Sequence, residues 1–173
     1  MTLYNNKYRS ETTRLPSWDY SSPGYYFVTI CVRHMRHLFG RVENDAMVLN
    51  YYGKIVFDEW ERTFQIRSNV IWDEFVVMPN HFHAVVHIAG KPCNARTLLH
   101  GVRTGKWKSG VLGAIMGQFK QQVTKKIRRN GVPGFNWLNR FYDHIVRDEE
   151  DLNRIREYIR NNPAKWGRDK FYS

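Results

Sequence analysis

The residues with the clearest chemical potential are His81 and His83, which are separated only by Phe82. On a β-strand, residues i and i+2 point to the same face, so both imidazoles would project together while Phe82 points into the opposite layer. Two imidazoles on one strand can hold a metal ion. The same pattern also fits two half-buried histidines that bond to their neighbours, and the pattern alone does not decide between these interpretations.

Tyr158 and Asn162 have the i, i+4 spacing that places two side chains on one face of a helix. Ile155 and Ile159 would belong to the apolar stripe of that helix, with Tyr158 at its flank. A tyrosine there can pack with its ring while its hydroxyl faces a cleft, although an ordinary boundary tyrosine is the simpler interpretation of the spacing. Pro163 biases Asn162 away from the α region, which weakens the expectation that Asn162 reaches the same site.

His144 ends the run Phe141-Tyr142-Asp143-His144, which is typical of a strand near the centre of a sheet. Such a histidine could line a site, or it could be a core residue with a backbone partner. We expect the second for His144, because it is the simpler interpretation.

The rest of the chain alternates between strand and helix patterns. Runs dense in β-branched and aromatic residues predict strands, and apolar residues at helical spacing predict helices. The expected elements are a strand at 25–33, a short hairpin at 38–49, a helix at 51–67, strands at 70–78 and 81–88 joined by a Pro-Asn turn, a helix at 110–130, a strand at 141–147 and a helix at 148–161. This order predicts an α+β fold: a ferredoxin-like antiparallel sheet with helices on one face and an added C-terminal helix that carries Tyr158.

Length and composition favour one domain. The chain has 173 residues, which we divide into an N-terminal arm at 1–24, a single domain at 25–166 and a C-terminal tail at 167–173. Cys31 and Cys93 form no metal-type pair, so neither a disulfide framework nor a zinc finger is expected. There is no apolar run that could cross a bilayer and no secretory signal, so we expect a cytoplasmic protein with no membrane partner.

The charge distribution indicates a polyanionic partner. The formal net charge is +11, and residues 75–142 contain no Asp or Glu. Nucleic acid would neutralise such a surface, although a basic face that only improves solubility has the same composition. Aromatic residues among the cations would suit stacking on unpaired bases. The residues expected to contact nucleic acid are Arg103, Lys106, Trp107, Lys108, Lys120, Lys125, Arg128 and Arg129.

Four segments occur together in this chain: Val77-Met78-Pro79-Asn80-His81-Phe82-His83, Gln118-Phe119-Lys120, Phe141-Tyr142-Asp143-His144-Ile145-Val146-Arg147 and Glu157-Tyr158-Ile159-Arg160-Asn161-Asn162-Pro163. In this order they resemble the single-tyrosine HUH transposases, and within them the REP-associated tyrosine transposase branch. The resemblance runs from about Tyr25 to Trp166. Each segment alone is unspecific, but the combination is quite specific.

The resemblance implies that residues 25–166 form a single HUH catalytic domain. His81 and His83 would be the metal ligands and Tyr158 the nucleophile. Asn162 falls where some relatives place a glutamine as a third ligand, and its side chain is one methylene shorter. The resemblance also implies Mg²⁺ or Mn²⁺, whereas the softness of nitrogen ligands alone favours zinc, iron or nickel.

The implied activity is cleavage and rejoining of single-stranded DNA through a 5′-phosphotyrosine intermediate. The implied substrates are strands that form hairpins or imperfect palindromes. In some relatives the tyrosine helix is swapped between two subunits, so a homodimer is compatible with the resemblance. The sequence leaves open whether the tyrosine acts within one chain or across two.

Two other functions compete with this hypothesis. A non-catalytic module that binds single-stranded DNA or RNA would share the ferredoxin-like architecture, but the aromatic strand pattern of common RNA binders is missing here. A replication-initiator or relaxase nickase would share the metal and tyrosine chemistry. Such nickases are larger proteins with helicase partners, and the short chain argues against them.

Overall fold

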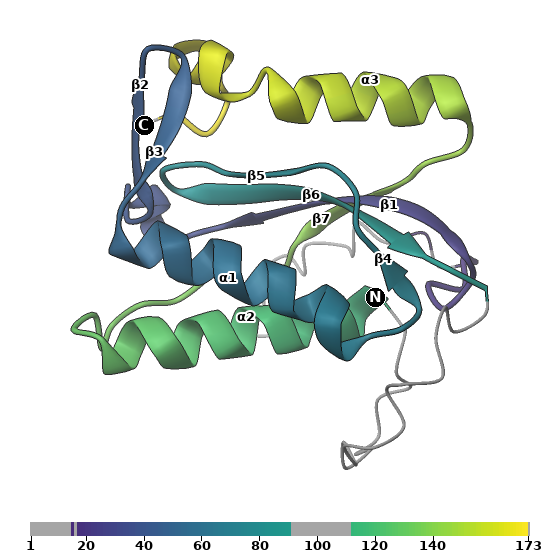
Figure 1. Ribbon diagram of the computed structural model, residues 1–173, viewed down its shortest axis with the longest axis horizontal. Helices are drawn as coiled ribbons and strands as arrows, with labels where there is room; N and C mark the ends of the chain where they lie inside the picture. Colours follow the sequence, from purple (N-terminus) through teal and green to yellow (C-terminus); the bar gives the residue numbers. More distant parts are fainter. Residues whose placement is uncertain (1–14, 16, 91–111, 173) are drawn as a thin grey trace, which may run out of the picture.

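A five-stranded antiparallel sheet forms the middle layer in the computed structural model, which describes residues 15, 17–90 and 112–172 (Figure 1). Its strands are β1 (Gly24–Cys31), β4 (Val70–Ile71), β5 (Phe75–Val77), β6 (His81–Ile88) and β7 (Tyr142–Ile145). β1 pairs with β6 on one side and with β7 on the other, and β4 and β5 both pair with β6. A separate hairpin consists of β2 (Gly40–Glu43) and β3 (Ala46–Leu49).

Helices lie on both faces of this sheet (Figure 1). α1 (Tyr51–Ile66) and α2 (Leu112–Arg129) cover one face, and α3 (Glu149–Arg160) crosses the other. Two short 3-10 helices, η1 (Arg33–Met35) and η3 (Pro163–Arg168), follow β1 and α3. The element order and strand pairing confirm the ferredoxin-like α+β fold with an added C-terminal helix. Within the described residues, no helix has the length and apolar character needed to span a membrane.

β6 separates the two layers, because side chains alternate between the faces of a strand. Phe82 lies between Trp60 of α1 and Phe119 of α2, with ring centroids 5.0 Å and 5.2 Å from theirs. His81 and His83 therefore face the α3 layer, as their spacing predicts.

The strand expected at 70–78 is not continuous, and β4 and β5 are separated by residues 72–74. Asp73 interrupts it, because its Oδ1 accepts the backbone N–H of Glu74 at 2.7 Å, a local bond that favours a turn over a strand. The same carboxylate accepts two hydrogen bonds from Arg156 of α3, at 2.9 Å and 2.6 Å. The interruption thus provides an anchor for α3.

α3 begins and ends near the expected residues. The Asp148 side chain caps its first turn by accepting the backbone N–H of Asp151 at 2.8 Å. The helix stops before Pro163, as expected, but the predicted departure of Asn162 from the α region is wrong: its φ is −61° and its ψ is −43°. The Asn162 N–H bonds to the Ile159 carbonyl at 3.2 Å, so the turn continues directly from α3 into η3.

Candidate metal and nucleophile site

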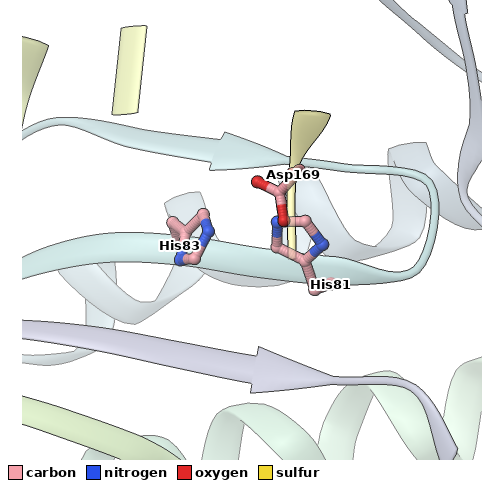
Figure 2. A group of neighbouring side chains, drawn as sticks. All are labelled: His81, His83 and Asp169. Carbon is pink, nitrogen blue, oxygen red and sulfur yellow. The ribbon is translucent and has the colours of Figure 1, made fainter. Parts of the chain in front are cut away.

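Two buried imidazoles meet at the start of β6. His81 and His83 project from the face that α3 crosses, with ring centroids 4.5 Å apart and relative exposures of 0% and 1% (Figure 2). The Phe171 ring lies 4.7 Å from His81, and the Phe27 ring lies 5.4 Å from His83. Because water is excluded, each ring nitrogen needs a protein partner or a ligand.

Asn80 determines which nitrogen of His81 carries a proton. The Asn80 amide nitrogen donates to the carbonyls of Met35, at 3.1 Å, and Phe171, at 2.8 Å. The Asn80 oxygen therefore faces His81 Nδ1, at 2.9 Å, and Nδ1 must be the donor. His81 Nε2 is then a bare acceptor, buried and without a hydrogen-bond partner among the described residues. An imidazole oriented in this way is prepared to ligate a cation.

His83 lies between two hydroxyl groups. Its Nδ1 is 2.7 Å from Thr29 Oγ1, and its Nε2 is 3.3 Å from Tyr158 Oη. The Tyr158 ring lies 5.3 Å from the His83 ring and is 38% exposed. The tyrosine of α3 thus meets the histidines of β6 on one face of the sheet, in the same chain.

A further ligand atom comes from Asp169, which the sequence analysis did not single out. One atom from each of His81, His83 and Asp169 lies within 4.8 Å of the others, and the three form a group that could hold a metal ion (Figure 2). Asp169 is the only acidic residue in 158–173, which is the one signal that the sequence offered. No spacing rule could connect it to β6, because it follows η3.

Asn162 lies in this group as well, and it is 2% exposed. Its Nδ2 donates to Asp169 Oδ2 at 2.9 Å. Its Oδ1 is buried and has no hydrogen-bond partner within the described part of the chain. The amide therefore orients the carboxylate and retains an unused oxygen.

Burial determines the protonation of the site. Burial lowers the pKa of His81 to about 4, against smaller opposing effects of Asp169 and Asn162. Burial and the neighbouring His81 hold the pKa of His83 well below its usual range. Burial, together with the Asp169 carboxylate, raises the pKa of Tyr158 to about 12. At neutral pH both imidazoles are therefore neutral, as ligands must be, and the phenol is protonated.

The expectation of a core histidine with a backbone partner is wrong for His144. The side chain is half-buried, and its Nε2 lies 2.7 Å from Asp151 Oδ2 in the first turn of α3. The reason is the position of β7, which is an edge strand rather than a central one. His144 fastens the start of α3 to the sheet.

Four of the residues expected to bind nucleic acid lie along α2, in the layer opposite the imidazoles. Together with Trp137 and Leu138 they line a hollow of about 620 Å³. These four residues are Lys120, Lys125, Arg128 and Arg129. Lys120 also donates to the Leu138 carbonyl at 2.6 Å, and burial lowers its pKa to about 8. The other four, Arg103, Lys106, Trp107 and Lys108, lie outside the described residues.

Two known proteins show which class of protein this chain is similar to. A solved structure of a REP-associated tyrosine transposase bound to a REP hairpin matches with a TM-score of 0.57 and 19% identity, over 98% of this chain and 77% of that one. A Haemophilus influenzae protein provisionally named a REP-associated tyrosine transposase is 26% identical over 93 residues, 53% of this chain and 48% of that protein. The chain has the fold of this transposase and resembles the REP-associated branch of the single-tyrosine HUH transposases in both fold and sequence.

The family of this chain is shown by a protein that is more similar in sequence. An uncharacterised protein of Haemophilus influenzae is 38% identical over 177 residues, which cover 99% of this chain and 98% of that protein. The chain belongs to one family with this Haemophilus protein. No protein-family model matches the chain.

Proposed function

We propose that the chain is an enzyme that cleaves and rejoins single-stranded DNA, with Tyr158 as the nucleophile beside a divalent metal ion. The observation that carries the proposal is the 3.3 Å distance between Tyr158 Oη and His83 Nε2. The net charge of +11 supports a nucleic-acid substrate. The solved transposase bound to a REP hairpin supports DNA that forms hairpins as that substrate.

The residues present fit a divalent cation. His81 Nε2 and Asn162 Oδ1 are buried without partners among the described residues, and Asp169 adds a negatively charged oxygen. We assign His81, His83 and Asp169 as ligands, with Asn162 as a further oxygen donor that also orients Asp169. A carboxylate favours Mg²⁺ or Mn²⁺ more than two imidazoles alone would. The bound ion would polarise the scissile phosphate and offset the negative charge that develops during attack.

Tyr158 would attack the phosphorus in line with the leaving oxygen. The bond between Tyr158 Oη and phosphorus forms as the bond from phosphorus to the 3′ oxygen breaks. The proton lost by the phenol is balanced by the proton that the departing 3′ oxygen takes up. The products are a 5′-phosphotyrosyl enzyme and a free 3′-hydroxyl. Another 3′-hydroxyl can reverse the step and rejoin the strand without ATP, because the covalent link stores the bond.

Two ion pairs hold the tyrosine helix in position for this attack. Arg156 pairs with Asp73, and Arg160 donates to Glu74 Oε2 at 2.7 Å. These arginines lie two residues before and after Tyr158, so both neighbouring turns of α3 are tied to the segment before β5. We therefore propose that Tyr158 acts on DNA bound at the histidines of its own chain.

The test is the formation of a covalent adduct. The protein is incubated with a hairpin-bearing single-stranded oligonucleotide and Mn²⁺, and the products are separated on a denaturing gel. We expect a slower band for the wild type, its loss when the metal is chelated, and its loss in Tyr158→Phe. Tyr51→Phe is a matched control, because Tyr51 is 59% exposed on α1 and bonds to Asn130. This control should form the adduct at the wild-type rate.

Two outcomes would contradict the proposal in different ways. An adduct that persists in Tyr158→Phe would remove Tyr158 from the mechanism. DNA binding without an adduct, independent of metal and unchanged in His81→Ala and His83→Ala, would identify a non-catalytic binding module instead.

A further inference from the structure

A second hollow lies beside η1. It has a volume of about 280 Å³ and is lined by the turn that follows β1 and by residues 134–136. Its basic lining residues are the arginines Arg33 and Arg36, with His34 between them in the sequence. All three are exposed, and none of them forms an ion pair with another described residue. A concave surface with unpaired cations is suited to an anion.

The backbone of this turn is held in an unusual conformation. His34 has a φ of 62° and Met35 a φ of 52°, so two consecutive residues other than glycine occupy the left-handed region. Such strain persists only where the surrounding structure enforces it, and it is concentrated at functional sites. Here the Asn80 amide donates to the Met35 carbonyl at 3.1 Å. The same amide group orients His81 through its oxygen.

The hollow shares a lining residue with the basic hollow along α2. Asn136 lines both, and Arg128 Nη2 donates to the Asn136 side chain at 2.5 Å. The Arg33 backbone N–H donates to the Asn136 carbonyl at 2.9 Å. The cations around η1 and those of α2 therefore line two hollows that share Asn136. An extended series of cations is complementary to a polymer with repeated negative charges rather than to a single small anion.

We propose that the hollow formed by Arg33, His34 and Arg36 binds backbone phosphates of the single-stranded DNA whose scissile phosphate lies at Tyr158. This inference rests on the proposed function and extends it, because it assigns a phosphate-binding subsite at a turn that is tied to a metal ligand. Asn80 connects the two, since it bonds both to the turn and to His81.

The experiment measures the salt dependence of DNA binding in a Tyr158→Phe background, where no strand is cut. Binding of a fluorescent single-stranded oligonucleotide is titrated at several salt concentrations for the parent and for Arg33→Gln/Arg36→Gln. The slope of log K against log salt is negative, and each lost phosphate contact on a single strand reduces its magnitude by about 0.7. The magnitude for the double variant should therefore be smaller by about 1.4. Its affinity at low salt should fall roughly tenfold.

The matched control is Arg62→Gln/Arg147→Gln, which removes the same two charges. Arg62 lies on α1 and Arg147 follows β7, and neither lines the hollow. The control should keep the parental slope, and so should Arg33→Lys/Arg36→Lys. The single variants Arg33→Gln and Arg36→Gln should each show about half of the change, and they provide the result if the double variant does not fold.

The outcomes separate the two proposals. Failure of the parent to bind the oligonucleotide would overturn the proposed function, and the subsite with it. Binding by the parent with equal slopes for the Gln variants and the control would overturn the subsite alone.

Discussion

The two faces of the sheet differ in what holds their helices. On the face covered by α1 and α2, the aromatic rings of Trp60, Phe82 and Phe119 pack together, each with at most 2% exposure. On the face crossed by α3, the buried apolar cluster among the described residues consists of Val85 and three residues of α3, with no aromatic ring among them. Polar contacts also attach α3 there, through Arg156, Arg160 and His144.

This difference shows how one strand can serve stability and chemistry at once. The alternation of β6 directs every second residue into an aromatic core that does not take part in the proposed reaction. The residues between them face the α3 layer, where His81 and His83 are buried and His83 meets Tyr158. The tyrosine helix is attached through its buried apolar residues and also through charged side chains at its edge, chiefly Arg156 and Arg160.

Two adjacent residues of β6 should respond in opposite ways to truncation. Phe82→Ala removes a ring from the aromatic core and should lower the free energy of unfolding by about 3–5 kcal/mol. His83→Ala should cost less, about 1–3 kcal/mol, because it leaves the buried Thr29 hydroxyl without its partner, yet it should abolish the covalent adduct. Urea denaturation and the gel assay measure the two effects. Equal losses of unfolding free energy in the two variants would show that both faces of β6 contribute equally to stability.

Acid should destabilise the α3 face through its imidazoles. The pKa of His81 is about 4 in the folded protein and 6.5 in a model peptide, so the unfolded chain binds more protons between these values. The metal-free protein should therefore lose stability as the pH falls from 6.5 to 4, by at most about 1 kcal/mol per pH unit from this group. His81→Gln should flatten the profile in urea titrations at several pH values. An unchanged slope in that variant would exclude His81 as the source.

The fold could be predicted from the sequence because its determinants are local. The period-two pattern of 81–88 and the helical periods of 51–67 and 110–130 depend on neighbours in the chain, and β6, α1 and α2 lie within these ranges. The break at Asp73 was missed although its cause is local, because a single Asp within a β-rich run is a weak signal against a strand: the Asp73 carboxylate accepts the backbone N–H of Glu74. Only the bond from Asp73 to Arg156, 83 residues away, lies beyond any local pattern.

The site residues could be predicted only where strand or helix periodicity determines their positions. His81 and His83 share a face by strand geometry, and the helix turns Tyr158 toward them. Asp169 follows no such period, since a 3-10 turn after Pro163 returns the chain to β6. Asn162 was doubted on a general preference of residues before proline, which the hydrogen bonds of this particular turn override.

The smallest expected effect concerns the ion pair that attaches α3. Burial alone would raise the pKa of Asp73, but hydrogen bonds from Arg156 and the Glu74 backbone lower it overall below 3.8. The pair therefore stabilises the fold above that pH and loses its effect as the pH falls through the lowered pKa. Asp73→Asn should cost about 1–2 kcal/mol at neutral pH and almost nothing in strong acid.

The same substitution should slow adduct formation while DNA binding is retained, because Tyr158 would be less firmly positioned. Glu43→Gln is the control, since its partner Arg41 is 73% exposed and such surface pairs contribute little. Samples quenched at successive times and run on a denaturing gel give the rate of adduct formation. Filter binding gives the affinity for DNA. An adduct rate equal to that of the control would mean that the apolar contacts of α3 suffice to position the tyrosine. The polar attachment would then be dispensable, and the contrast between the two faces would be one of composition only.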